Sequence, residues 1–112
     1  MIQPKEAHEL ANRGQAVIVD VREEHELRET GQVAGSWWLP TSKMHADEPE
    51  WKGFLARLPK EKKIAVYCRS GQRSGRVSEY LKLEGFDAVN LGGFKDWQAA
   101  GLPTQAFTGK SS

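Results

Sequence analysis

Short apolar runs rich in β-branched residues alternate along this chain with segments in which apolar residues recur at helical spacing. A continuous run of this kind is typical of a strand that is covered on both faces. Strands that alternate with helices favour a mostly parallel sheet with helices on both sides. We therefore predict an α/β domain with a central sheet of about five strands. The clearest strand patterns lie at residues 16–21, 36–39, 64–67 and 88–91.

Helix signals fill the segments between these runs. Apolar residues recur at i, i+3, i+4 and i+7 from Trp51 to Leu58, and the charged stretch 22–29 is interpreted as a short helix or turn. Pro4 marks a helix start, and helix ends are marked by Pro59 and by the glycines Gly14, Gly31, Gly85 and Gly101. The helix after residue 72 is expected to turn Val77, Tyr80, Leu81 and Leu83 inward. The last helix carries Phe94 and Trp97.

The length of 112 residues fits one domain, which we place at residues 1–107, followed by a polar tail at 108–112. The 16 basic and 15 acidic side chains give a net charge of +1, which argues against a nucleic-acid or acidic-membrane partner. No apolar run approaches the ~20 residues of a membrane span. The first residues lack the pattern of a signal peptide. We therefore expect a cytoplasmic monomer.

The chain contains one cysteine, Cys68, at the end of the predicted strand 64–67. One cysteine can form neither an internal disulfide nor a cysteine-based metal site. A short loop with a glycine leads from it into a helix, and such a loop points backbone N–H groups inward. These N–H groups, together with Arg69 or Arg73, favour a thiolate and lower the pKa of the cysteine. The position therefore predicts an activated nucleophile.

Four segments, in this order, resemble the sequence elements of the single-domain rhodanese family of sulfurtransferases. The resemblance runs through nearly the whole chain and rests on Asp20–Arg22, Gly31–Pro40, Cys68–Ser74 and Leu91–Pro103. Gln32 stands where the family commonly has histidine, and Ser36 stands where it has alanine. We interpret the histidine position as structural, so the change leaves the predicted chemistry in place.

The resemblance implies a double displacement in which the Cys68 thiolate takes a sulfur atom from a donor such as thiosulfate. The resulting persulfide then passes that sulfur to cyanide or a thiol. The resemblance implies no cofactor and no metal, and a sulfur-relay protein is a further expected partner. The expected contacts to the donor and the persulfide come from the loop residues Arg69, Ser70, Gly71, Gln72 and Arg73. For Arg73, contact with the anion and bracing of the loop remain equal alternatives. Asp20, Arg22 and Ser74 are expected to support the site.

Two other functions fit parts of this pattern. Related phosphatases and arsenate reductases resemble this fold but have one more residue between cysteine and arginine, whereas Cys68 and Arg73 are only five positions apart. A rhodanese-like interaction module without catalysis is the other alternative, although such a module needs neither the cysteine nor the glycine-bearing loop.

The remaining candidate residues have simpler interpretations. Trp37 and Trp38 point to opposite faces of a strand, so one belongs to the core and the other, if exposed, could form a partner patch. Trp51 and Trp97 are interpreted as core residues. The three histidines lack the spacing of metal ligands.

Overall fold

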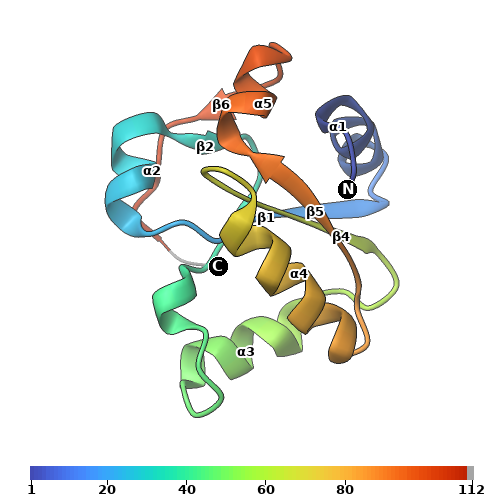
Figure 1. Cartoon of the computed structure of the whole chain (residues 1–112), viewed down its shortest axis with the longest axis vertical. Coiled ribbons are helices and arrows are strands. Elements are labelled where there is room, and N and C mark those ends of the chain that lie inside the picture. The colour runs from blue at the N-terminus through green and yellow to red at the C-terminus, as the bar shows by residue number, and fades with distance from the viewer. Residues whose placement is uncertain (111–112) are drawn as a thin grey trace.

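Four parallel strands form the central sheet of the computed structural model, which describes residues 1–110 (Figure 1). The sheet order is β3-β1-β4-β5, so the strand that carries Cys68 lies in its interior. The predicted parallel α/β fold is confirmed, with four strands in the main sheet instead of about five. These strands are β1 (Ala16–Asp20), β3 (Trp37–Trp38), β4 (Lys63–Cys68) and β5 (Asp87–Gly93).

A second, two-stranded antiparallel sheet was not visible in the sequence pattern. It joins β2 (Gln32–Val33) to β6 (Thr104–Gln105). Each of these strands has two residues, which is too short for the period-two alternation that identifies a strand in sequence. The pairing holds the C-terminal segment against the turn that follows α2 (Glu24–Thr30).

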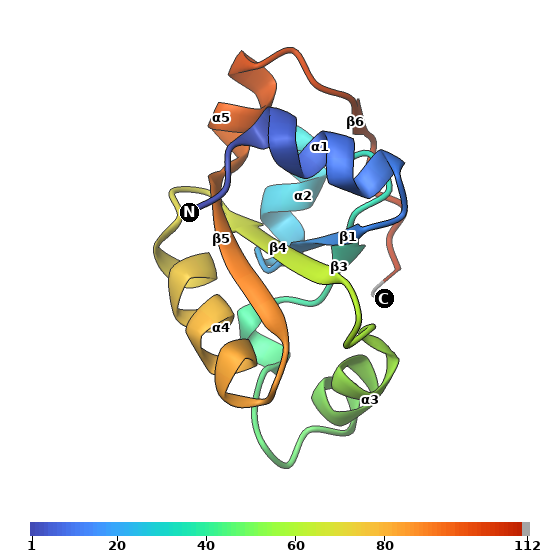
Figure 2. The same ribbon diagram turned by 90° about the vertical axis from the view of Figure 1, so that its right-hand side faces the viewer.

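Helices cover both faces of the main sheet (Figure 2). The helices α3 (Pro49–Arg57) and α4 (Gln72–Leu83) lie on one face, and α1 (Pro4–Asn12) and α5 (Phe94–Ala99) lie on the other. A short 3-10 helix, η1 (Thr41–Lys43), leads from β3 toward α3. These bounds agree with the predicted helix boundaries, and the charged stretch 22–29 contributes most of α2.

Successive residues of β4 enter two separate cores. Ile64, Val66 and Cys68 pack in the cluster beneath α3 and α4, whereas Ala65 and Tyr67 pack in the cluster beneath α1 and α5. This alternation follows from the period of two in a strand. Cys68 therefore lies on the face of the sheet that α4 covers.

The predicted burial of two residues in α4 is wrong. Tyr80 is 41% exposed and Leu83 is 85% exposed, whereas Leu81 is fully buried. The two residues follow the apolar period of the helix, but α3 and the sheet cover only the part of its surface around Leu81 and the half-buried Val77.

The four tryptophans all contribute to packing. Trp38 is buried and donates from its indole N–H to the carbonyl of Arg22, while Trp37 is half-buried against Phe54. Among the described residues, neither tryptophan is one of the large apolar side chains that are exposed. The pair therefore forms no exposed aromatic patch. Trp51 and Trp97 are buried, which confirms their interpretation as core residues.

Within residues 1–110, the structure contains no helix that is both long and apolar enough to cross a bilayer. Of the predicted polar tail at 108–112, residues 111 and 112 lie outside the described part of the chain.

Candidate active site

The carboxyl ends of the parallel strands bring the predicted site residues to one edge of the sheet. Cys68 ends β4, Asp20 ends β1 and Gly93 ends β5, and these strands are neighbours in the sheet. Binding sites in open parallel α/β sheets lie outside these strand ends. The loop 69–71 then turns the chain from β4 into α4.

The thiol of Cys68 lies beneath this loop, with no exposed surface. The Gly71 N–H donates to its Sγ at 3.0 Å, and the Ser74 N–H and hydroxyl lie 3.5 Å and 3.4 Å from it. Burial by itself raises the pKa of Cys68, but hydrogen bonds from Ser74, Gly71 and Ser70 outweigh it and leave the pKa below its ordinary value. The loop is therefore built to hold a negative sulfur.

The inward direction of the Gly71 N–H depends on a left-handed backbone at this residue. Gly71 has a φ of 97°, a region that favours glycine. Its carbonyl, turned the other way, accepts a hydrogen bond from the Asn90 side-chain amide at 3.0 Å. The Asn90 oxygen in turn accepts from the Ser74 hydroxyl at 2.8 Å and from the Gly92 N–H at 3.0 Å. Asn90 on β5 thus fixes two of the groups that face Sγ.

Replacing Ser74 with alanine is expected to raise the pKa of Cys68, because it removes the polar hydroxyl 3.4 Å from Sγ and the hydrogen bond that ties the start of α4 to Asn90. The pH at which the thiolate absorbance of Cys68 appears should therefore rise. The rate of modification of Cys68 by a thiol reagent should begin to increase at the same higher pH. Ser78→Ala is the matched control, because Ser78 is a buried serine of the same helix whose hydroxyl donates to the Gly75 carbonyl. Identical titrations for the Ser74 variant and the native protein contradict this role.

Arg73 braces the loop by joining α4 to α2. Its two terminal nitrogens bind the two carboxylate oxygens of Glu26 at 2.7 and 2.8 Å. These hydrogen bonds lower the pKa of Glu26 to about 2, so the pair stays ionised at neutral pH. The structure therefore shows an ion pair that braces the loop, and contact of Arg73 with an anion stays a prediction.

The other loop side chains face solvent. Arg69, Ser70 and Gln72 are exposed, and Arg69 lines a cavity of about 530 Å³ at the mouth of the loop. Arg73, Glu26, Glu29 and Lys95 also line this cavity. Arg69 and Lys95 make no ion pair with any residue in the described range 1–110. These two cations are therefore the ones free to attract an anionic donor.

Asp20 and Arg22 form a buried ion pair behind the loop. The Arg22 side chain donates to Asp20 at 2.8–3.1 Å, to the Thr30 hydroxyl at 2.8 Å and to the Gly31 carbonyl at 2.8 Å. Burial lowers the pKa of Arg22, but the Asp20 carboxylate more than offsets this and raises it. The pair ties the end of β1 to Thr30, the last residue of α2, and to Gly31, which precedes β2. Neither side chain forms one of the hydrogen bonds to Sγ described above.

Gln32 and Ser36, the two residues that differ from the family pattern, contact each other. The Gln32 amide donates to the Ser36 hydroxyl at 2.9 Å and to the Ser36 carbonyl at 3.3 Å. Gln32 begins β2 and Ser36 lies between β2 and β3, so neither belongs to the loop that surrounds Cys68. Their contact is consistent with a structural role for position 32.

Three residues of the site region were missed by the sequence analysis: Glu26, Asn90 and Lys95. Asn90 left a usable signal, because asparagine is disfavoured inside strands and here interrupts an apolar run. Glu26 was hidden among other charges in 22–29. Within residues 1–110, the structure contains no group of three or more histidine, cysteine, aspartate or glutamate side chains that could hold a metal ion.

Comparison with known proteins shows which family this chain resembles in sequence. A sequence model described as a rhodanese-like domain matches residues 3–100. The chain is 33% identical to a thiosulfate sulfurtransferase GlpE of Stutzerimonas stutzeri, with 87% of this chain and 83% of the relative covered. It is also 33% identical to a sulfurtransferase of Allochromatium vinosum, with coverages of 87% and 85%.

A solved structure extends the likeness to the fold. The crystal structure of a rhodanese-related protein from Thermoplasma volcanium superposes with a TM-score of 0.77 at 31% identity, covering 95% of this chain and 97% of that one. The sequence match, the fold and the cysteine loop at the carboxyl edge of the sheet agree with one another. This chain belongs to the family of rhodanese-like domains.

Proposed function

We propose that this protein is a sulfurtransferase that carries a sulfane sulfur as a persulfide on Cys68. The observation that carries the proposal is the set of donors around Sγ, above all the Gly71 N–H at 3.0 Å. Donors held in this way stabilise a thiolate before the reaction and a negative persulfide after it. The name of the GlpE relative, a thiosulfate sulfurtransferase, favours thiosulfate as the donor.

In the first step, the Cys68 thiolate attacks the outer sulfur of thiosulfate. A new S–S bond forms to Cys68 while the bond to the sulfonate sulfur breaks, and sulfite leaves with the electron pair of that bond. Since Cys68 has no exposed surface, Sγ has to become accessible before the outer sulfur can reach it. Arg69 and Lys95 at the cavity mouth are placed to attract the sulfonate end.

In the second step, a nucleophilic acceptor attacks the terminal sulfur of the persulfide. Cyanide leaves as thiocyanate, or a thiolate leaves as a new persulfide, and the Cys68 thiolate is regenerated with the electron pair of the broken S–S bond. The chain contains no second cysteine that could resolve the persulfide internally. The sulfur therefore waits for an external acceptor, which could be a small molecule or the cysteine of a relay protein.

Intact mass spectrometry after incubation with thiosulfate tests the proposal. The native protein should gain one sulfur atom and lose it again on addition of cyanide, with release of thiocyanate. Cys68→Ser should show neither change while keeping the native circular dichroism spectrum. An unchanged mass of the folded native protein contradicts the proposal and favours the interaction module. Cysteine-dependent hydrolysis of a phosphate ester in place of sulfur uptake favours the phosphatase alternative.

A further inference from the structure

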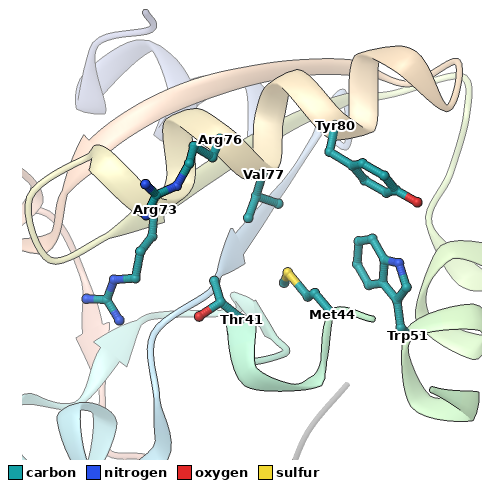
Figure 3. Close-up of a pocket in the computed structure, with 7 residues that line it drawn as sticks. All are labelled: Thr41, Met44, Trp51, Arg73, Arg76, Val77 and Tyr80. Atoms are coloured by element: carbon teal, nitrogen blue, oxygen red, sulfur yellow. The ribbon is translucent and has the colours of Figure 1, made fainter. Parts of the chain in front are cut away.

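A second hollow shares Arg73 with the cavity at the mouth of the loop. It has a volume of about 370 Å³ and runs between α4 and the segment that contains η1 and the start of α3. We call it the α4 groove, and its lining residues are drawn in Figure 3. Arg73 lines both hollows, and its ion pair with Glu26 lies on the side of the loop-mouth cavity.

One end of the α4 groove is aromatic and held in place by the core. Trp51 is buried and stacks on Phe54, with ring centroids 6.2 Å apart. Tyr80 lies against Trp51 with centroids 5.6 Å apart and remains 41% exposed. Met44 and Val77 continue this apolar surface toward the other end (Figure 3). A ligand that enters here meets a surface already formed, so little ordering cost opposes binding.

The opposite end of the groove is cationic. Figure 3 shows Arg73 and Arg76 at this end, away from Trp51 and Tyr80. Glu26 neutralises Arg73, whereas Arg76 is exposed and forms no ion pair with any residue in the range 1–110. None of the described residues that line the groove is an aspartate or a glutamate. An unpaired guanidinium at one end of a preformed aromatic surface complements a ligand with an acidic group and an apolar body.

We propose that the α4 groove binds a small organic anion, with its acidic group at Arg76 and an aromatic or branched aliphatic body against Trp51 and Tyr80. This role goes beyond the proposed sulfur transfer, which would use the cavity at the mouth of the loop and a small inorganic donor. It also gives a reason for the exposure of Tyr80, whose ring forms a wall of the groove.

Titration of the ¹⁵N-labelled native protein with naphthalene-2-sulfonate tests this site by NMR. The compound carries no thiol or sulfane sulfur, so its binding does not depend on Cys68 chemistry. We expect a saturable shift of the Trp51 indole N–H signal, together with backbone shifts at Arg76 and Tyr80. The uncharged naphthalene-2-sulfonamide should bind about three- to fivefold more weakly, because it lacks the charge that Arg76 recognises.

Variants at the two ends of the groove separate the charge from the apolar contribution. Arg76→Gln should weaken sulfonate binding about three- to fivefold, and Tyr80→Ala about five- to tenfold. Both residues are exposed, so both variants should keep the native fold. The matched control is Arg13→Gln, which changes an exposed arginine just after α1, across the sheet, and should bind as the native protein does. Shifts confined to Lys95 and the loop 69–72, or unchanged affinity in folded Arg76→Gln, overturn the proposal.

Discussion

Replacing Asp20 with alanine is expected to lower the free energy of unfolding by about 3–5 kcal/mol, since it leaves the buried guanidinium of Arg22 without its carboxylate. This is a large part of the roughly 5–15 kcal/mol that stabilises a typical domain. The variant also removes the acceptor of the Arg22 backbone N–H, which binds Asp20 at 2.9 Å. Urea unfolding followed by tryptophan fluorescence measures the loss.

Glu24→Ala is the matched control for this prediction. Glu24 pairs with Arg28 at 2.6 Å, but both side chains are more than half exposed. An exposed pair of this kind contributes at most about 1 kcal/mol. If Asp20→Ala proves insoluble, Asp20→Asn, which keeps the shape but removes the charge, should still be markedly less stable than the control. If Asp20→Asn and Glu24→Ala lose the same free energy of unfolding, the buried pair stabilises the fold no more than the exposed pair does, which contradicts this prediction.

Gly93→Ala is expected to reduce the rate of persulfide formation from thiosulfate by roughly 10²-fold, the usual effect of losing one well-placed donor. A Cβ on Gly93 would meet the carbonyl oxygen of Arg69 at a separation no real Cβ tolerates, and that oxygen belongs to the backbone of the loop. Relief of this clash moves the loop away from β5, and with it the Gly71 N–H that binds Sγ. Single-turnover mass measurements at neutral pH give the rate.

Gly53→Ala separates this local effect from a general effect of adding a methyl group. Gly53 lies in α3, and its Cβ would meet only the flexible end of Arg57. Alanine in a helix is favoured over glycine by about 1 kcal/mol, so this variant should be at least as stable as the native protein and equally active. A folded Gly93→Ala with the native rate would show that the close approach of β5 does not position the loop.

The position of Cys68 at the carboxyl end of a buried strand could be predicted because it depends on local pattern. The run from Ile64 to Tyr67 identifies a buried strand, and parallel sheets place sites at the carboxyl ends of strands. The glycine in the next loop predicts the inward N–H groups, and Gly71 supplies the nearest of them. None of this requires knowledge of which strands are neighbours.

The burial of α4 shows where such patterns stop being informative. Tyr80 and Leu83 have the spacing of an inner face, yet both are exposed. Periodicity describes which residues share a side of a helix, but the extent of the neighbouring elements decides how wide the covered stripe is. The uncovered part of α4 here forms a wall of the α4 groove.

The sequence by itself determined the parallel α/β class, the helix and strand positions near their observed bounds, and Cys68 as the centre of the site. Only the tertiary structure paired Arg73 with Glu26 and brought Asn90 and Gly93 against the cysteine loop. The physical reason is the range of the interactions. Strand and loop conformation follow from neighbouring residues, whereas these contacts depend on the order β3-β1-β4-β5 and on how the helices pack across it.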